Sequence, residues 1–448
     1  MNNHTIVALA TPQGLGAIGV VRLSGDDALR IAQAIFAGKN LLTAASHSAH
    51  FGRITQPSGE VIDEVVATVF VAPRSYTKQN TVEFSCHNSP YILEQIINLC
   101  LQQGAVMATA GEFTLRAFLN GGLDLSQAEA VADLIASHSA ASHRLAMQQM
   151  RGGISSELDV LREKLIHFAS LIELELDFGE EDVTFANRTD LQALIQEILD
   201  KINALIQSFA LGNALKNGVP TAILGKPNAG KSTLLNSLLG EERAIVSPIP
   251  GTTRDTIEEV INIKGLAFRI IDTAGIRQTT NEIEAIGVKK AMEQAQKAGL
   301  IIYVYDAQKQ PIAEVMQEVA ALNLPNTHTI VCANKIDLAP VQPVNDAVLG
   351  ISAQHKTNLE ALKGLMVEKI GYNAHSNQIL VTNLRHKQAL EQAKVALEQA
   401  LAGLSAGVSG DFLAMDIRHA TQQIASITGR IDVEDLLANI FSKFCIGK

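Results

Sequence analysis

Residues 225–232 read G-K-P-N-A-G-K-S and fit the phosphate-loop pattern G-x-x-x-x-G-K-[ST] at every fixed position. The run before this loop is apolar and of strand type, and the run after it has the composition of a helix. The glycines let the backbone fold tightly, so that its N–H groups converge on a phosphate at a helix N-terminus. In this pattern Lys231 supplies a cation for the β- and γ-phosphates, and the Ser232 hydroxyl is placed to hold Mg²⁺. The stretch predicts a nucleotide site in an α/β domain; the weaker alternative is a chance glycine-rich turn.

Three further motifs indicate which nucleotide is bound. Residues 334–337 read N-K-I-D and follow an apolar strand. The Asp337 carboxylate can accept two hydrogen bonds, which suits the N1–H and N2–H₂ groups of guanine and repels the acceptor N1 of adenine. Residues 272–275 read D-T-A-G, and Ser352 and Ala353 stand where a base-contacting loop is expected. Four signals in this order predict a GTP-binding domain rather than a generic ATPase.

Composition limits the class of protein. With 448 residues the chain is long enough for two to four domains, and it has no apolar run long enough for a membrane helix. Its four cysteines are scattered and form no C-x-x-C pair, so we expect neither a disulfide framework nor a zinc site, and a cytoplasmic location. The formal net charge of −10 argues against a broad nucleic-acid-binding surface.

Hydrophobic periodicity predicts a multidomain fold of α/β and all-α parts. Residues 1–118 alternate strands and helices, which indicates an N-terminal α/β domain. Residues 119–215 and 374–448 have helical spacing, with helices expected over 125–141 and 145–178 among others. The GTP-binding domain occupies residues 216–373. The simplest arrangement joins the two helical stretches into one discontinuous domain, with the GTPase domain inserted in it.

One motif in the N-terminal domain is misleading. Residues 14–19 spell G-x-G-x-x-G after a strand, which is the dinucleotide-binding fingerprint. That fingerprint must open a helix, but this run leads into another strand. A glycine-rich hairpin loop is the better interpretation.

The segments after the phosphate loop bear on hydrolysis. Residues 251–255 read G-T-T-R-D, and a threonine hydroxyl here can complete the Mg²⁺ shell while γ-phosphate is present. Asp272 would hold Mg²⁺ through water, and the Gly275 N–H is placed for the γ-phosphate. Many GTPases have a glutamine next to orient the attacking water, whereas this chain has Ile276, which can neither donate nor accept a hydrogen bond. Glu282 and Glu284, in the loop after this motif, are the candidates for a substitute water-positioning group.

Three further runs lie outside the GTPase motifs: residues 111–120 read G-E-F-T-L-R-A-F-L-N, residues 123–130 read L-D-L-S-Q-A-E-A, and residues 444–448 read F-C-I-G-K. With these runs and the GTPase motifs, the chain resembles the MnmE (TrmE) family of tRNA-modification GTPases over essentially its full length. The GTPase motifs alone are shared with ribosome-assembly GTPases, so the three runs make the resemblance specific.

The resemblance implies a homodimer formed through N-terminal domains that bind a one-carbon folate, 5,10-methylene- or 5-formyl-tetrahydrofolate. It implies a helical domain interrupted by an inserted Ras-like P-loop GTPase domain, and K⁺-dependent pairing of the two GTPase domains. Members act with the flavoprotein MnmG, which carries FAD, in a heterotetrameric or larger complex. Together they add a (carboxymethyl)aminomethyl group to C5 of the wobble uridine, U34, of certain tRNAs.

The resemblance also implies roles for individual residues. Catalysis would involve Lys231, Thr253 and Glu284, with Glu284 positioning the attacking water. Mg²⁺ would be held by Ser232 and Thr253. K⁺ would be held by Asn228, Ser247, Ile249 and Thr252. Together with the motifs above, the expected GTP contacts are Asn228, Ala229, Gly230, Lys231, Ser232, Thr233, Ser247, Thr252, Thr253, Asp272, Thr273, Ala274, Gly275, Asn334, Lys335, Asp337, Ser352 and Ala353.

For the N-terminal domain, the resemblance places Arg22, Glu83 and Lys448 near the folate, and it links Cys445 to the modification chemistry. The chain departs from the family pattern at Gly122, where a lysine is common. It also has Lys78-Gln79 where the family has Gly-Glu. One lost cation near a glutamate-tailed ligand is expected to weaken folate binding rather than abolish it.

Two other functions compete with a tRNA-modifying enzyme. A ribosome-assembly-type regulatory GTPase, acting as an RNA-binding switch, would carry a basic appendage, whereas the N-terminal domain is nearly neutral and residues 121–215 are acidic. A structural dimer with a vestigial GTPase is disfavoured because the phosphate and guanine motifs are intact.

Overall fold

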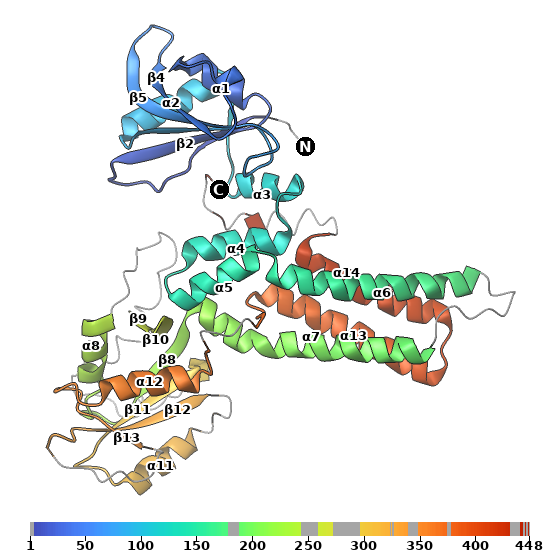
Figure 1. Ribbon diagram of the computed structural model, residues 1–448. Coiled ribbons are helices and arrows are strands. Elements are labelled where there is room, and N and C mark those ends of the chain that lie inside the picture. Colours follow the sequence, from blue (N-terminus) through green and yellow to red (C-terminus); the bar gives the residue numbers. More distant parts are fainter. Residues whose placement is uncertain are drawn as a thin grey trace. The chain divides into compact units, whose positions relative to one another are not determined.

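The computed structural model describes residues 4–177, 188–242, 259–271, 296–322, 324, 327–338, 348–373, 378–430, 440–441, 444 and 447. The chain divides into two compact units, coloured by sequence in Figure 1. The first unit consists of residues 1–132 and 425–448, and the second of residues 133–424. The domain boundaries expected at residues 118, 215 and 373 stay predictions.

A seven-stranded sheet forms the centre of the first unit, in the order β3-β4-β5-β6-β2-β1-β7. Neighbouring strands are antiparallel except β1 and β7, which run parallel. In β5, Val65, Ala67 and Val69 are buried and alternate with more exposed residues, the period of two expected when one face of a sheet packs on a core. The strands are β1 (Ile6–Leu9), β2 (Ile18–Ser24), β3 (Phe36–Gly38), β4 (Ser48–Thr55), β5 (Val61–Phe70), β6 (Thr81–His87) and β7 (Val106–Met107).

Two helices, α1 (Ala28–Ile35) and α2 (Pro90–Gln102), pack against this sheet. Ile31 of α1, Ile96 of α2 and Phe84 of β6 are fully buried in one hydrophobic cluster. The mixed α/β organisation expected for the N-terminal region is therefore present. The shorter helices of the unit are η1 (Leu41–Thr43), α3 (Glu112–Leu119) and the start of α4 (Leu125–Ala136).

The glycine-rich run at residues 14–19 is a hairpin connection. Strands β1 and β2 on either side of it are antiparallel, with Leu9 opposite Val21. Ile18 already belongs to β2, so the run opens a strand and not a helix. The hairpin interpretation is confirmed, because a dinucleotide site needs the N-terminus of a helix at this point.

The end of the chain packs in the first unit. The rings of Phe441 and Phe118 lie 6.5 Å apart, and both contribute to a cluster with Leu125. Gly447 lies so close to β1 that a Cβ atom there would be 2.2 Å from the carbonyl oxygen of Leu9. The C-terminal segment is therefore part of the unit that contains the N-terminal sheet.

Four long helices of the second unit form an antiparallel bundle (Figure 1). Arg188 at the start of α7 pairs with Glu175 near the end of α6 at 2.8 Å. Lys387 near the start of α13 lies 5.2 Å from the ring of Phe209, near the end of α7. The helices are α6 (Gly153–Asp177), α7 (Arg188–Asn217), α13 (Leu384–Ala406) and α14 (Gly410–Thr428).

The structure divides the helical region before the bundle differently from the sequence pattern. Helices were expected over 125–141 and 145–178, but a separate helix, α5 (Ala140–Met150), lies between α4 and α6. The reason is a capping box at its start: Ser142 N–H donates to Ser139 Oγ, and Ser139 N–H donates to Ser142 Oγ, both at 3.1 Å. These hydroxyls satisfy N–H groups that a helix start leaves without partners, so a new helix begins here.

A six-stranded sheet forms the rest of the second unit, in the order β13-β12-β11-β8-β10-β9. All neighbouring strands are parallel except β9 and β10, which form an antiparallel hairpin. The strands are β8 (Val219–Leu224), β9 (Glu259–Ile263), β10 (Leu266–Ile270), β11 (Leu300–Asp306), β12 (His328–Asn334) and β13 (Val348–Gly350).

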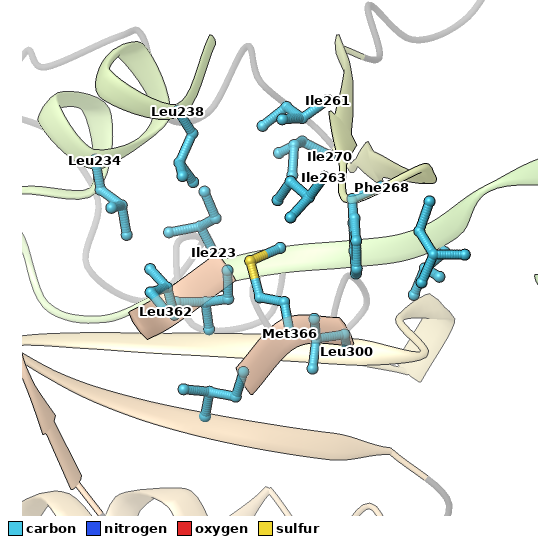
Figure 2. Close-up of a cluster of buried hydrophobic side chains, with 14 of the residues drawn as sticks. Ile223, Leu234, Leu238, Ile261, Ile263, Phe268, Ile270, Leu300, Leu362 and Met366 are labelled. Carbon is cyan, nitrogen blue, oxygen red and sulfur yellow. The ribbon is translucent and has the colours of Figure 1, made fainter. Parts of the chain in front are cut away.

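Helices cover both faces of this sheet. On one face, α8 (Lys231–Glu242) and α12 (Leu359–Lys369) share a buried cluster with the strands. Figure 2 shows Leu238 of α8 and Met366 of α12 in this cluster, together with side chains of β8 to β11. On the other face, α11 (Ile312–Ala321) packs through Val315 against a second cluster. A parallel sheet between helices has its ligand sites at the carboxyl ends of its strands.

Among the helices that the structure describes, none is long and apolar enough to cross a membrane.

Candidate nucleotide-binding site

The predicted GTP motifs that the structure describes, which are the phosphate loop, N-K-I-D and Ser352-Ala353, come together at the carboxyl edge of the six-stranded sheet. The phosphate loop follows β8, Asp306 ends β11, and Asn334 ends β12. Ser352 and Ala353 follow β13, the edge strand next to β12. The chain leaves β8 for α8 on one face and leaves β11 for α11 on the other. The edge between β8 and β11 is therefore the switch point at which such sheets bind ligands.

Two glycines of the phosphate loop are required by close packing, one against a neighbouring backbone and one against a side chain. Gly225 has a φ of +140°, and a Cβ atom there would lie 1.9 Å from the carbonyl oxygen of Val304 in β11. Gly230 has a φ of +99°, and its Cβ would lie 2.1 Å from Asn334 Nδ2. Between them, Asn228 adopts a left-handed conformation with a φ of 63°. In loops of this kind, alternating backbone conformations let successive N–H groups point into one concave site that favours an anion.

Lys231 and the next two residues, Ser232 and Thr233, form the first turn of α8. Their position is the helix N-terminus, where N–H groups favour an anion. The Lys231 ammonium donates to the carbonyl oxygens of Gly225 at 2.7 Å and Lys226 at 2.9 Å. Burial lowers the pKa of Lys231. The cation is thus held over the loop by main-chain oxygens, on the side where phosphate is expected.

Asn334 connects three parts of the site. Its Nδ2 atom donates to the carbonyl oxygen of Ala229 in the phosphate loop at 2.8 Å. Its Oδ1 atom accepts the N–H of Ala353 at 3.0 Å. The Ala353 carbonyl oxygen in turn accepts a hydrogen bond of 2.7 Å from Ser237 of α8. These bonds join the ends of β8 and β12 with the loop after β13.

Lys335 is held in place by a carboxylate that the sequence analysis did not single out. Its ammonium donates to Asp306 Oδ2 at 2.7 Å and to the carbonyl oxygen of Asn228 at 3.0 Å. Burial acts to raise the pKa of Asp306, but hydrogen bonds from Lys335 and from the Gln308 N–H outweigh it and lower that pKa. The Lys335 stem is thereby extended across the site. One signal was available in the sequence, since Asp306 is the charged residue at the end of an otherwise apolar strand.

Asp337 has the properties of a guanine acceptor. Its hydrogen bond with Ser352 is the main cause that lowers its pKa below the ordinary value of 3.8. Its side chain is 21% exposed, with the His355 ring 3.8 Å away. At neutral pH it is therefore an ionised, accessible carboxylate that accepts hydrogen bonds and donates none.

Several predicted site residues lie outside the described part of the chain, so their roles stay predictions. They are Ser247, Ile249, Thr252, Thr253, Asp272, Thr273, Ala274, Gly275, Glu284, Cys445 and Lys448. Among the residues that are described, no group of three or more His, Cys, Asp or Glu side chains could hold a metal ion.

Arg22 and Glu83, both predicted near folate, are brought together in the N-terminal sheet. They lie opposite each other on β2 and β6, and Arg22 Nε is 2.7 Å from Glu83 Oε1. Arg22 also donates to the Gly447 carbonyl oxygen at 3.0 Å and lies 5.5 Å from the centroid of the Phe113 ring. The N-terminal sheet and the C-terminal segment therefore meet at one charged pair.

Gly122, noted above as a departure from the family pattern, lies next to a lysine. A Cβ atom built on Gly122 would lie 3.3 Å from both Cγ and Cε of Lys78. Lys78 is exposed and has a left-handed backbone with a φ of 62°. Its stem therefore crosses the place where a side chain at position 122 would begin.

Three cysteines are buried and are poor nucleophiles. Burial is the main cause that raises the pKa of Cys86 to about 11, and it raises the pKa values of Cys100 and Cys332 to about 12. The thiolate is the reactive form, so these side chains are inert at neutral pH. Cys445 remains the cysteine proposed for chemistry.

Two family models match the chain, one in its N-terminal part and one over the remainder. The family model "GTP-binding protein TrmE N-terminus" matches residues 5–122, and the model "MnmE helical domain" matches residues 125–445. Among solved structures, the G domain of the T. maritima FeoB iron transporter is 28% identical, with a TM-score of 0.26 over 34% of this chain and 98% of that chain.

Relatives named tRNA modification GTPase MnmE are similar over the whole sequence. The protein of Cytophaga hutchinsonii is 52% identical over 456 residues, which cover 100% of this chain and 99% of that protein. Those of Christiangramia forsetii and Flavobacterium johnsoniae are 49% and 48% identical over 100% of this chain, covering 99% and 100% of those proteins. With full-length identity at this level and two matching family models, the chain belongs to the MnmE family of tRNA modification GTPases.

Proposed function

We propose that this chain binds GTP at the carboxyl edge of the six-stranded sheet and hydrolyses it to drive tRNA modification. The observation that carries the proposal is the bonding of Asn334, which fastens the guanine motif to the phosphate loop through Ala229 and to Ala353. The two ends of a guanine nucleotide are thereby recognised by one rigid framework.

Different described residues contact different parts of the nucleotide. The loop N–H groups and the N-terminus of α8 face the phosphates, and Lys231 exchanges its carbonyl partners for phosphate oxygens. The Asp337 carboxylate accepts the N1–H and N2–H₂ groups of guanine. The stem of Lys335, held by Asp306, covers the base. Because phosphoryl transfer needs positioning and charge stabilisation above all, a rigid array of donors is the main contribution of the protein.

Two cations complete the proposed site. Ser232, in the first turn of α8, fits Mg²⁺ together with Thr253, since hydroxyl oxygens suit this hard cation. When bound, Mg²⁺ neutralises the charge that develops on the β- and γ-phosphate oxygens. The proposed K⁺ ligands are Asn228, Ser247, Ile249 and Thr252, and K⁺ would supply the positive charge that an arginine finger supplies in other GTPases. Asn228 fits this role because it is an exposed residue of the phosphate loop with an amide oxygen in its side chain.

Water positioning falls to Glu284, which lies outside the described residues. The residue after the D-x-x-G motif is Ile276, whose side chain forms no hydrogen bond. A carboxylate from the following loop can accept a proton of the attacking water and align its lone pair. Pairing of two GTPase domains in a homodimer would exclude solvent around this step.

We further propose that the GTPase domain is inserted between α7 and α13. The returning segment packs against α7, since Val381 N–H donates to Ser208 Oγ at 3.0 Å. A Cβ atom on Gly212 would lie 2.2 Å from the Val381 carbonyl oxygen, so the two backbones touch. Gln149 of α5 adds a hydrogen bond of 2.9 Å to Thr382. These contacts would transmit the nucleotide state to the helical part.

The remaining partners are proposed from family membership. We propose that the N-terminal domain binds a one-carbon tetrahydrofolate near Arg22 and Glu83, with Lys78 replacing the lysine that the family has at position 122. When bound, the folate supplies the one-carbon group for the modification. The chain would act as a homodimer with MnmG on U34 of tRNA, and Cys445 would take part in that chemistry.

The test is GTP turnover in KCl and in NaCl at equal ionic strength, with Asn228→Ala and Glu284→Ala compared to the wild type. A K⁺-specific rate that both substitutions remove supports the proposed ion and water roles. Asn217 provides a control because it is exposed and is the last residue of α7, outside the phosphate loop. Asn217→Ala should therefore leave turnover unchanged. Equal slow rates in both salts would contradict the K⁺ mechanism. A regulatory GTPase of the ribosome-assembly type, whose activating group comes from another molecule, would then be favoured.

A further inference from the structure

Lys226, the second residue of the phosphate loop, is paired with two carboxylates of one helix. Its ammonium lies 2.6 Å from Glu314 Oε1 and 2.8 Å from Glu318 Oε1. Both glutamates belong to α11 and are four residues apart, so they occupy one side of that helix. Two carboxylates therefore bracket one cation.

The Lys226 side chain points toward the face of the sheet that is opposite to α8. The phosphate loop leads into α8, which packs on one face, whereas α11 packs on the opposite face. Lys226 therefore reaches from the loop to the α11 face of the sheet, away from the helix N-terminus that receives phosphate. A lysine neutralised in this way adds little positive charge to the phosphate site.

Further hydrogen bonds hold Glu318 in position. Its Oε2 atom accepts the hydroxyl of Tyr303 from β11, and its Oε1 atom accepts Gln310 Nε2 at 3.0 Å. Burial acts to raise the pKa of Glu318, but the hydrogen bonds from Lys226, Tyr303 and Gln310 together lower it. The ion pair is thus the outer end of a network rooted in the sheet, which makes it more rigid than an isolated surface pair.

The backbone of Lys226 in turn locates the catalytic lysine. Its carbonyl oxygen accepts Lys231 Nζ at 2.9 Å and the Ala229 N–H at 3.3 Å. On one side of it, Gly225 is packed against Val304 of β11, and on the other side Pro227 has a fixed φ. A side chain tied to α11 therefore fixes the main-chain oxygen that orients Lys231.

We propose that Lys226 is a positioning residue: with Glu314 and Glu318 it forms a latch that holds the phosphate loop against α11 in a shape ready for nucleotide. The inference rests on the GTP site proposed above. It differs from a direct role of Lys226 on phosphate, in which the two glutamates would merely compete for the cation.

The first test measures backbone hydrogen exchange of the loop in the full chain without nucleotide. In Lys226→Met and in Glu314→Gln/Glu318→Gln, the amides of residues 226–230 should exchange faster than in the wild type. The triple variant should exchange no faster than either, because all three side chains act through one latch. Lys226→Arg should exchange as the wild type does, since a guanidinium can pair with both carboxylates. Lys297→Met, an exposed lysine three residues before β11, is the matched control and should change nothing.

The second test is the dissociation constant for GTP and for GDP. Lys226→Met should weaken both nucleotides by roughly 3- to 10-fold, the effect that two partly exposed ion pairs support. Lys226→Arg should bind within about twofold of the wild type. The proposal is overturned if loop exchange is unchanged in Lys226→Met. It is also overturned if the glutamine pair tightens nucleotide binding with no change in exchange, since Lys226 would then act on phosphate directly. If the wild-type chain binds no GTP, the proposed function fails, while the exchange experiment still decides whether the latch exists.

Discussion

The side-chain amide of Asn334 donates a hydrogen bond of 2.8 Å to the main-chain carbonyl of Ala229, a residue 105 positions earlier in the chain. The Asn334 side chain is buried and its other end accepts the Ala353 N–H at 3.0 Å. The asparagine of the guanine motif therefore holds the phosphate loop and the base loop in register with each other, and need not touch the nucleotide to be essential.

Asn334→Ala should damage nucleotide binding and stability together. It leaves the Ala229 carbonyl and the Ala353 N–H without their buried partner, at a cost of about 1–3 kcal/mol. We expect GDP to bind at least ~10-fold more weakly, since 1.4 kcal/mol corresponds to tenfold. Calorimetric titration and thermal unfolding measure both effects. Asn217→Ala, whose side chain is exposed, should change neither, and a normal GDP affinity in Asn334→Ala would refute the framework role.

Gly230→Ala tests whether the loop shape depends on glycine. The φ of +99° disfavours any residue with a Cβ, and that atom would lie 2.1 Å from Asn334 Nδ2. We expect GTP binding to fall sharply and the unfolding free energy to drop by about 1–3 kcal/mol. Gly240→Ala, within the helix α8 that begins directly after Gly230, is the matched control. No atom lies within 4 Å of its Cβ position, so this change should stabilise α8 by about 0.5–1 kcal/mol with GTP binding retained. If Gly230→Ala and Gly240→Ala bound GTP equally well and were equally stable, the loop shape would not depend on glycine at position 230.

Asp337→Asn should change the preferred base from guanine to xanthine. An amide presents one donor and one acceptor, which matches the C2 carbonyl and N1–H of xanthine but not the two donors of guanine. GTP affinity should fall roughly 10- to 100-fold, the value of hydrogen bonds to a charged group. Displacement of a bound fluorescent nucleotide by GTP and by XTP measures the relative affinity of the variant for the two bases. Unaltered selectivity would mean that another residue recognises the base.

Lys78→Met tests the proposed folate site. The Lys78 stem lies 3.3 Å from the Cβ position of Gly122, so we propose that its ammonium supplies the cation that Gly122 lacks. We expect tetrahydrofolate with its glutamate tail to bind roughly 3- to 10-fold more weakly, as for one lost, partly exposed ion pair. Lys39→Met, an exposed lysine of the same unit, should have no effect. If Lys78→Met binds folate as tightly as the wild type, Lys78 does not replace the cation that is missing at position 122.

Local patterns in the sequence were sufficient to predict much of this molecule. The phosphate loop, the strand that precedes it and the helix after it are close in sequence, so glycine positions and hydrophobic periodicity describe them. The hairpin at residues 14–19 was predicted for the same reason, since the residues after the glycines decide between strand and helix. The guanine motif could be located because Asn334 and Asp337 stand at and just beyond the end of an apolar strand.

Tertiary structure decided which distant groups meet. Lys335 needs Asp306, Lys226 needs Glu314 and Glu318, and Arg22 meets Glu83, with no sequence spacing that predicts these pairs. The physical reason is that strand order and helix placement depend on burial of apolar surface over the whole domain, which brings strand ends together regardless of their separation along the chain. The sequence by itself determined the kind of chemistry, through short motifs with fixed backbone demands. Only the folded sheet determined how those motifs are held to one another.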